Sequence, residues 1–440
     1  MDASVTSFPH RTLTARRATD AESLVSMPTL CFAVIGLATL FNTIDINASF
    51  ESTEDHVGVD WPVMVKLAIA AIAGFVGASG LAFSARVRRS LLTLPGFVLI
   101  ALSSVFVVTS AFAYDEVATV SRIAALINVA YLLFVPTALA ALGLRRLLIA
   151  CLIGMVANLL INWGLYLGVP QVGVFEEELG NQTFINRMGG LGHPNAIARI
   201  GVLTVLISMA MLRDDSRKNK RAVLIALIVL GIMTAISTFS RSAFVAGCAG
   251  AMFLMVDRLL TRGGVLLGLA MAAVIAVGVI GVELTSGGAF EGDSIALVVT
   301  KTGEVEELTS ATGRTEIWAE AIRLIAERPL IGWGLNSAPK LMQNFSMHTH
   351  NLLLHATFSG GVMAGLLTVL LLGWNLFSGL SSTLAITRAI SAYVLVSCIF
   401  EDTVLDTFAS PSTLLWFVVL LYPAIILSSK GPGDDAQAVE

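Results

Sequence analysis

Residues 351–374 have the sequence NLLLHATFSGGVMAGLLTVLLLGW, which contains no Asp, Glu, Lys or Arg. A helix of about 20 mostly apolar residues crosses the hydrocarbon core of a bilayer, so this segment predicts a transmembrane helix. Similar apolar runs recur along the chain, and none alternates apolar with polar residues as membrane β-strands do. Helices and closed barrels are the structures that satisfy their backbone groups in lipid. The sequence therefore predicts an all-α integral membrane protein.

The apolar runs predict about twelve membrane-spanning helices. They lie near residues 28–46, 62–84, 91–113, 118–142, 147–169, 194–212, 222–239, 242–257, 264–283, 351–374, 383–400 and 412–428. The composition agrees, because 56% of the 440 residues are hydrophobic, 13% are charged and the mean hydropathy is +0.82. We expect a single polytopic domain at 28–428, with its first span retained, between disordered cytoplasmic tails at 1–27 and 429–440.

Charge and cysteine content argue against several classes of protein. The net charge is -4 and no basic patch is interleaved with aromatic residues, so nucleic acid is not an expected partner. Cys31, Cys151, Cys248 and Cys398 lie in separate apolar runs, without a CxxC pair or a neighbouring histidine. This pattern predicts neither disulfides nor a zinc site. We expect no metal and no cofactor.

The basic residues of the short loops predict the orientation, because Lys and Arg mark the cytoplasmic side. They cluster on every second loop, around residues 86–89, 145–146, 213–221, 258–262 and 430. The intervening loops are mainly acidic, at residues 51–60, 115–116, 176–178 and 401–406. We therefore expect both termini in the cytoplasm and the long polar loop at about 284–350 on the outer side.

Several arginines lie on the outer side, where topology does not require them. They are Arg187, Arg199, Arg241, Arg314, Arg323 and Arg328. Guanidinium groups bind phosphate oxygens in bidentate fashion, so these residues predict an anion at the outer membrane surface. The alternative is that they pair with local acids. Lys66 and Arg122 lie inside predicted spans near their outer ends, where they either have a function or extend to the interface.

The second half of the polar loop predicts an amphipathic helix that starts near Arg314 and ends at Pro329. Its apolar residues recur at helical spacing, at Ile317, Trp318, Ala321, Ile322 and Ile325. Glu316, Glu320, Arg323 and Glu327 lie on the opposite face at the spacing of helix ion pairs, so we expect Arg323 and Arg328 to pair locally. Arg314 lies at the helix start, where backbone N–H groups favour anions.

Three further segments bring histidine, asparagine or arginine to the outer side. MHTHN (347–351) places His350 and Asn351 where the polar loop meets a span, and a histidine imidazole there is suited to accept a proton from a hydroxyl. NRMGGLGHPNAIARIG (186–201) carries Arg187 and Asn195. TFSRSAFVAG (238–247) carries Arg241 at a tight turn, where anchoring at the interface is the alternative role.

These segments, in this order, resemble the O-antigen ligase and O-antigen polymerase superfamily of bacterial membrane glycosyltransferases. The resemblance rests on RMGGLGHPNAIA, SRSA, GRTEIW followed by ERPLIGWG, and HN, with ten residues between His350 and Gly361. It covers residues 186–365, and the first 180 residues contribute hydropathy alone.

The resemblance implies a GT-C-like membrane fold that transfers a glycan from undecaprenyl diphosphate to an acceptor hydroxyl, on the periplasmic face of the inner membrane. It implies His350 as the base of a metal-independent, inverting displacement. We expect Arg187, Arg241 and Arg314 to stabilise the leaving diphosphate, and Asn195 and Asn351 to bind substrate with them. The partners are then the lipid-linked donor, a glycan or lipid A-core acceptor, the bilayer and polysaccharide assembly proteins.

Several functions stay open at the level of the sequence. We favour a surface polysaccharide polymerase, because no dedicated basic surface for a phosphorylated lipid A-core is evident. An O-antigen ligase is the alternative within the family. A transporter of lipid-linked intermediates or polysaccharide is a different class, although its polar groups usually lie at the membrane midplane and here they concentrate at one face. A non-catalytic scaffold is a third class.

Overall fold

Helices make up most of the computed structural model, which describes residues 26–44, 61–178, 184–214, 218–256, 314–402 and 404–427. The helices are α1 (Met27–Phe41), α2 (Trp61–Phe83), α3 (Ala85–Leu91), α4 (Leu94–Ser110), α5 (Ala118–Gly168), α6 (Pro170–Gly173), α7 (Pro194–Asp214), α8 (Lys218–Ser237), α9 (Arg241–Leu254), α14 (Arg314–Glu327), α15 (Ala338–Leu341), α16 (Leu352–Trp374), α17 (Ala385–Phe400) and α18 (Pro411–Leu427). A π-helix, η2 (Asn375–Gly379), continues α16.

The structure is that of a multi-pass membrane protein. Within the described residues, α2, α5, α7, α8 and α16 are long and apolar enough to cross a bilayer, and α3 with α4 makes a sixth if the bent pair is one span. Helices α1, α9, α17 and α18 are apolar but shorter. The count of twelve spans is not confirmed. The predicted span at 264–283, the first part of the polar loop and nearly all of both tails lie outside the described residues.

Two helices depart from the predicted boundaries, each at a break in the helix. The spans expected at 118–142 and 147–169 are joined in α5, where Gly143 has a φ of 70° that interrupts the helical geometry. Glycine has no Cβ and so adopts this left-handed conformation without a steric penalty. The span expected at 91–113 corresponds to α4, and the basic segment before it, which was expected to be a loop, forms α3, bent from α4 by 77°.

A short antiparallel hairpin interrupts the helical fold, and the sequence did not predict it. Strands β1 (Val174–Glu178) and β2 (Phe184–Met188) pair with Phe175 opposite Arg187. The run of glutamates in β1 lacks the alternation that predicts a strand, so the segment was expected to be an acidic loop. In the hairpin, Glu177 lies diagonally from Arg187 on the same face, where cross-strand side chains interact.

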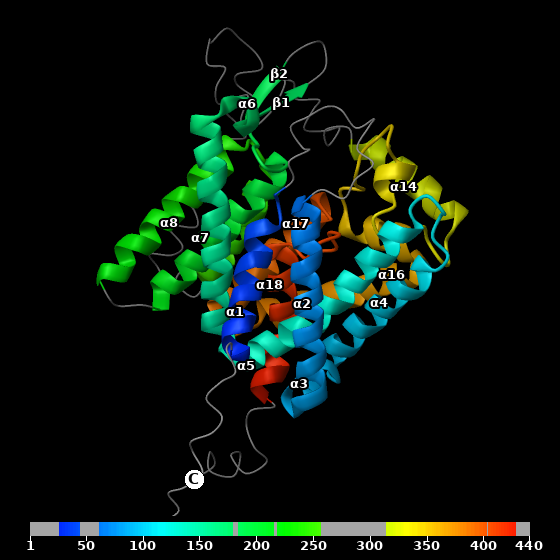
Figure 1. Cartoon of the computed structure of the whole chain (residues 1–440), viewed down its shortest axis with the longest axis horizontal. Coiled ribbons are helices and arrows are strands. Elements are labelled where there is room, and N and C mark those ends of the chain that lie inside the picture. Colours follow the sequence, from blue (N-terminus) through cyan, green and yellow to red (C-terminus); the bar gives the residue numbers. More distant parts are fainter. Residues whose placement is uncertain are drawn as a thin grey trace, which may run out of the picture.

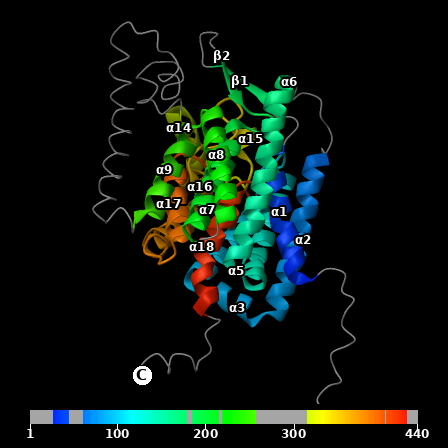
Figure 2. The same ribbon diagram turned by 90° about the vertical axis from the view of Figure 1, so that its left-hand side faces the viewer.

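The helices pack around α5, which contacts α1, α2, α4 and α18 (Figure 1, Figure 2). On one side of this group, α7 packs against α8 and α9, and α17 packs against α9. The hairpin and α14 lie at one end of the bundle, here called the hairpin end, and α3 lies at the opposite end (Figure 1). The predicted site residues of the described chain belong to segments that reach the hairpin end.

The predicted amphipathic helix is confirmed as α14, and a break in α16 holds the chain that follows it. Gly361 has a φ of 72°, which frees carbonyl groups of α16. Trp333 N donates to Phe358 O at 2.8 Å, Gly334 N donates to Ser359 O at 2.8 Å, and Val362 N donates to Pro329 O at 2.7 Å. These bonds explain why the segment ERPLIGWG and Gly361 occur together. The backbone of the segment bonds to backbone groups of α16 that the break at Gly361 leaves free.

Replacing Gly361 with Ala should destabilise the protein. A Cβ atom at this position would lie 2.2 Å from Leu330 O, and the φ of 72° is unfavourable for alanine. We expect a loss of about 1–3 kcal/mol from the backbone strain alone, measured as a lower thermal unfolding temperature in detergent. Gly373→Ala in the same helix is the control, because its Cβ would meet nothing within 4 Å. Equal unfolding temperatures for the two variants would contradict this account.

Candidate active site

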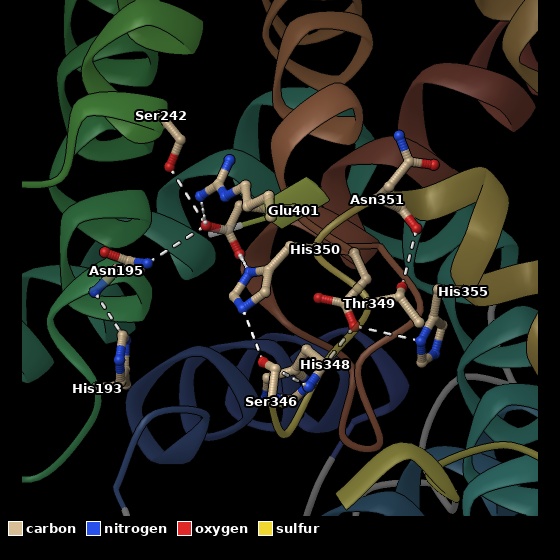
Figure 3. Close-up of polar contacts among 12 residues, drawn as sticks. His193, Asn195, Ser242, Ser346, His348, Thr349, His350, Asn351, His355 and Glu401 are labelled. Atoms are coloured by element: carbon tan, nitrogen blue, oxygen red, sulfur yellow. Dashed lines mark hydrogen bonds and ion pairs between the residues drawn. The ribbon is translucent and has the colours of Figure 1, made fainter. Parts of the chain in front are cut away.

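The carboxylate of Glu401, directly after α17, is the point on which Asn195, Arg314 and His350 converge (Figure 3). Its side chain is 8% exposed. Oε1 accepts hydrogen bonds from Asn195 Nδ2 at 3.3 Å, Ser242 Oγ at 3.3 Å and Arg314 Nη2 at 3.2 Å, and Oε2 lies 3.3 Å from His350 Nδ1. The four partners come from α7, α9, α14 and the segment before α16. Glu401 therefore joins parts of the chain that are far apart in sequence.

The backbone before α16 holds His350 in place for this contact. His350 has a φ of 49°, a left-handed conformation that is uncommon outside glycine. The next residue, Asn351, caps α16, because its Oδ1 accepts from Leu354 N at 3.0 Å while its Nδ2 donates to Ile399 O at 3.1 Å. Both ends of the Asn351 amide thus make structural bonds, and its expected role in binding substrate stays a prediction.

The two ring nitrogens of His350 have different surroundings. In the tautomer with the proton on Nδ1, the Nδ1–H group donates a hydrogen bond to Glu401 Oε2. Nε2 then carries the lone pair. Nε2 lies 3.1 Å from Ser346 Oγ, so a hydroxyl group reaches this nitrogen in the folded protein (Figure 3). The carboxylate therefore orients the imidazole with one nitrogen available to accept a proton.

Arg187 is almost fully buried, with 1% of the residue exposed, and is bound on all sides. Its Nε donates to Thr238 O at 2.8 Å, its Nη2 donates to Asn195 Oδ1 at 2.8 Å, and its Nη1 forms an ion pair with Glu177. Burial lowers the pKa of Arg187, and the charge of Glu177 offsets part of this effect. Asn195 bonds to both Arg187 and Glu401, and so links the buried arginine to the carboxylate.

Arg314 and Arg241 add further positive charge to this network. Arg314 begins α14, and its guanidinium also lies 5.7 Å from the centre of the Phe400 ring. Burial lowers the pKa of Arg314, the charge of Glu401 raises it, and the charge of Arg241 lowers it. Arg241 acts on the pKa of Arg187 in the same direction. Arg241 therefore acts electrostatically on both of the other arginines proposed to stabilise the leaving diphosphate.

A cavity of about 420 Å³ opens beside this network. His350, Glu401 and Asn195 line it, together with His193 and His348. Among the described residues that line it, the lysine and arginine side chains are those of Lys66 and Arg199. Arg187, Arg241 and Arg314 are not among its lining residues. A second cavity, of about 380 Å³ between α7, α8 and α9, is lined by none of the predicted site residues.

A second histidine–carboxylate cluster adjoins the first one. Asp402 Oδ2 lies 3.4 Å from His348 Nδ1 and 3.3 Å from His355 Nδ1. Desolvation opposes protonation of His348, but the charge and hydrogen bond of Asp402, together with the charges of Asp406 and Glu401, outweigh it and raise the pKa of His348 to about 9. Burial also raises the pKa of Asp406 to about 6, with the charge of Arg199, 3.9 Å away, opposing the shift.

His193, which lines the same cavity, is an uncharged member of the site at neutral pH. Burial lowers its pKa to about 4, and the positive charge of Arg187 acts in the same direction. Its Nδ1 accepts a hydrogen bond from Asn195 N at 3.2 Å, and this bond favours an unprotonated Nδ1. Within the described residues, no group of three or more His, Cys, Asp or Glu side chains has an arrangement suited to a metal ion.

Sequence reasoning missed the acidic residues of the site. Glu401, Asp402 and Asp406 were interpreted only as the acids of an outward loop. Their position between two apolar runs was a signal, because the nearby arginines and histidines of the outer side need counter-charges. For Arg323 the expectation of local ion pairs is confirmed, because it pairs with Glu320 at 2.6 Å and also with Glu327 on α14. Arg328 instead donates to Phe112 O at 3.2 Å, 216 positions away, and its guanidinium lies 4.2 Å from the centre of the Trp333 ring.

The fold and the site together define a multi-pass membrane protein with a buried acid–base network at one end of its helical bundle. Residues 225–369 match the family model described as O-antigen ligase. This match confirms the predicted relationship to the O-antigen ligase and polymerase superfamily. It includes Arg241, Arg314 and His350, whereas Arg187, Asn195 and Glu401 lie outside the matched residues. A search of curated proteins finds no match.

The stability of the protein should depend on the charge of His348. A histidine with a raised pKa contributes stability that is fully present below its unfolded value, near 6.5, and is lost as the pH rises through about 9. The unfolding temperature of the unmodified protein should therefore fall between pH 6.5 and 9. In His348→Gln this fall should be smaller, because Gln does not titrate. Parallel curves for the two proteins over this range would contradict the assignment.

Proposed function

We propose that the protein transfers a glycan from an undecaprenyl diphosphate-linked donor to an acceptor hydroxyl, as a surface polysaccharide polymerase. The observation that carries the proposal is the His350–Glu401 pair, which faces a polar cavity with a ring nitrogen available for a proton. The family match supports the coarser statement, a role in glycan transfer during surface polysaccharide assembly.

In the proposed reaction, His350 Nε2 removes the proton of the acceptor hydroxyl. The acceptor oxygen forms a bond with the anomeric carbon while the bond from that carbon to the phosphate oxygen breaks. The diphosphate leaves with the bonding electrons, and the anomeric configuration inverts. Glu401 binds Nδ1 and stabilises the imidazolium that forms, which is the role of a carboxylate beside a histidine base. No metal takes part in these steps.

The three arginines contribute positive charge on the side of the site where the reaction generates negative charge. Preorganised charges stabilise a transition state more than a ground state when charge develops during the reaction. Arg314 bonds to Glu401, Arg187 is linked to Glu401 through Asn195, and Arg241 acts electrostatically on both arginines. Asn195 lines the cavity, and we retain Asn195 and Asn351 as substrate-binding candidates.

We further propose the cellular arrangement that the loop charges indicate. The domain at 28–428 lies in the bacterial inner membrane, both termini are cytoplasmic, and the loop at about 284–350 and the cavity face the periplasm. Polysaccharide assembly proteins are its expected partners. An O-antigen ligase is the second candidate function, favoured by the description of the matching family. Transport is a weaker candidate, because the polar groups of the site gather at the hairpin end.

Mass spectrometry of lipid-linked glycans from strains with and without the protein would separate the two activities. Accumulation of single repeat units in the deletion strain would support a polymerase. Accumulation of long lipid-linked chains with bare lipid A-core would identify a ligase instead. Transfer by the purified protein in detergent, where no gradient exists, would exclude a transporter.

Replacing His350 with Ala should lower the transfer rate about 10² to 10⁴-fold, because a general base contributes an acceleration of that order. The measurement is transfer of labelled glycan in membranes that contain equal amounts of protein. Arg323→Ala is the control, because this arginine pairs on the exposed face of α14. If His350→Ala kept full activity while Arg314→Ala lost it, the base role would be wrong.

Replacing Glu401 with Gln should lower kcat by a factor on the order of 10² or more, because the orienting carboxylate of a histidine base contributes at least that much. The side chain keeps its size, but the charge that stabilises the imidazolium is lost. We expect KM for the donor to change less than kcat. Glu320→Gln on α14 is the matched control. Unchanged kcat in a Glu401→Gln protein that unfolds at the normal temperature would exclude the role.

A further inference from the structure

We propose that the hydroxyl of Ser346 occupies His350 Nε2 until an acceptor replaces it, and that it thereby protects the donor from hydrolysis. This inference rests on the proposed function and concerns its preference for an acceptor hydroxyl over water. The contact that carries it joins Ser346 Oγ to His350 Nε2 at 3.1 Å. Ser346 is then a specificity-determining residue of the site.

The direction of this hydrogen bond follows from the groups around it (Figure 3). A carboxylate accepts hydrogen bonds and donates none, so the proton of the neutral ring lies on Nδ1, 3.3 Å from Glu401 Oε2. Nε2 is then an acceptor, and the Ser346 hydroxyl is its donor. The backbone N–H of His348 in turn donates to Ser346 Oγ at 3.2 Å. The hydroxyl therefore occupies the nitrogen that acts as the base.

The backbone holds the Ser346 side chain in this position. Ser346 N donates to Met342 O at 2.9 Å. The bond from His348 N to Oγ closes a short turn around the side chain, an arrangement that serine hydroxyls commonly form. This bond engages a lone pair of Oγ, so the serine is arranged as a hydrogen-bond donor to His350 and not as a nucleophile.

The cavity gives the contact its importance. Ser346 and His350 both line it, together with the exposed Met347 and with Glu401. A polar cavity of about 420 Å³ has room for water. A histidine base with an open Nε2 would accept a proton from water as well as from a sugar hydroxyl. A donor in this cavity therefore needs protection while no acceptor is bound.

Hydrolysis of the donor would follow the same course as transfer. The water oxygen would form a bond with the anomeric carbon, and its proton would pass to His350 Nε2. The bond from that carbon to the phosphate oxygen would break, and the diphosphate would leave with the bonding electrons. The products are a free reducing glycan and undecaprenyl diphosphate. Because the two reactions use the same base, access to Nε2 decides between them.

Competition for Nε2 penalises water more than it penalises the acceptor. Water has to replace the Ser346 hydroxyl as a single small molecule at a fixed concentration. An acceptor glycan also contacts other parts of the cavity, and this binding offsets the lost hydrogen bond. For the acceptor the cost is a higher KM, which a saturating concentration overcomes. For water the cost persists as a lower rate of hydrolysis.

Hydrolysis of the donor in the absence of acceptor tests the proposal. Native lipid-linked glycans from the deletion strain are supplied to the full-length protein in nanodiscs, far below the KM for acceptor, and released reducing glycan is measured. Ser346→Ala should hydrolyse the donor about two- to tenfold faster, because a neutral hydrogen bond contributes a factor of that order. Ser346→Thr keeps a hydroxyl and should hydrolyse as slowly as the unmodified protein. Ser79→Ala is the control, because this serine on α2 bonds to Phe75 O.

Two further measurements report on the contact itself. Ser346→Ala should lower the KM for the acceptor by a similar factor, because the internal competitor is lost. Diethyl pyrocarbonate modifies unprotonated imidazoles, and peptide mass spectrometry follows the reaction without turnover. Modification of His350 should be about two- to tenfold faster in Ser346→Ala, whereas His193 should react equally in both proteins. Equal reactivity of His350 in the two proteins would overturn the proposal.

The outcomes separate this inference from the proposed function. If the unmodified protein transfers glycan and a folded Ser346→Ala protein hydrolyses donor no faster, the protective role is wrong and the transfer stands. A loss of transfer by about 10²-fold or more in Ser346→Ala would make the serine a nucleophile or a proton relay, which also overturns the proposal. If the unmodified protein neither transfers nor hydrolyses the glycan, the proposed function fails and this inference fails with it. Should Ser346→Ala not fold, Ser346→Gly decides by the same criteria.

Discussion

The burial of the Glu401 carboxylate is the constraint on which the site depends. A carboxylate removed from water is costly unless it is hydrogen-bonded and compensated by positive charge. Glu401 meets this requirement through side chains of α7, α9 and α14 and through His350. Because each partner is itself held by its own segment, the carboxylate ties the ends of these segments into one arrangement.

The same requirement explains why the arginines at the hairpin end are bonded inside the protein. Arg187 is the most buried of them and is satisfied by a backbone carbonyl, by Asn195 and by Glu177 of the hairpin. Arg314 is partly exposed and shares Glu401 with His350. These charges preserve the geometry of the site, whereas Lys66 and Arg199 line the cavity.

Backbone features fix where these side chains lie. The left-handed conformations at His350 and Gly361 bracket the first part of α16. The chain after α14 bonds to the carbonyl groups that the break at Gly361 releases. A single helix break thus positions α14, which begins with Arg314, relative to the segment that carries His350. Strain at such positions persists only where the surrounding structure enforces it.

The sequence by itself determined the membrane class, most helix positions, α14 with its surface ion pairs, and the grouping of His350 with Arg187, Arg241 and Arg314 as candidates. These features are local: hydropathy and helical periodicity act over one or two turns, and so can be read along the chain. Only the tertiary structure decided that Glu401 is the common partner, that the glutamates near residue 177 form a strand, and that Lys66 and Arg199 line the cavity. Glu401 and Asn195 are 206 positions apart. Packing alone brings such residues together, because no local pattern encodes which distant charge neutralises a buried one.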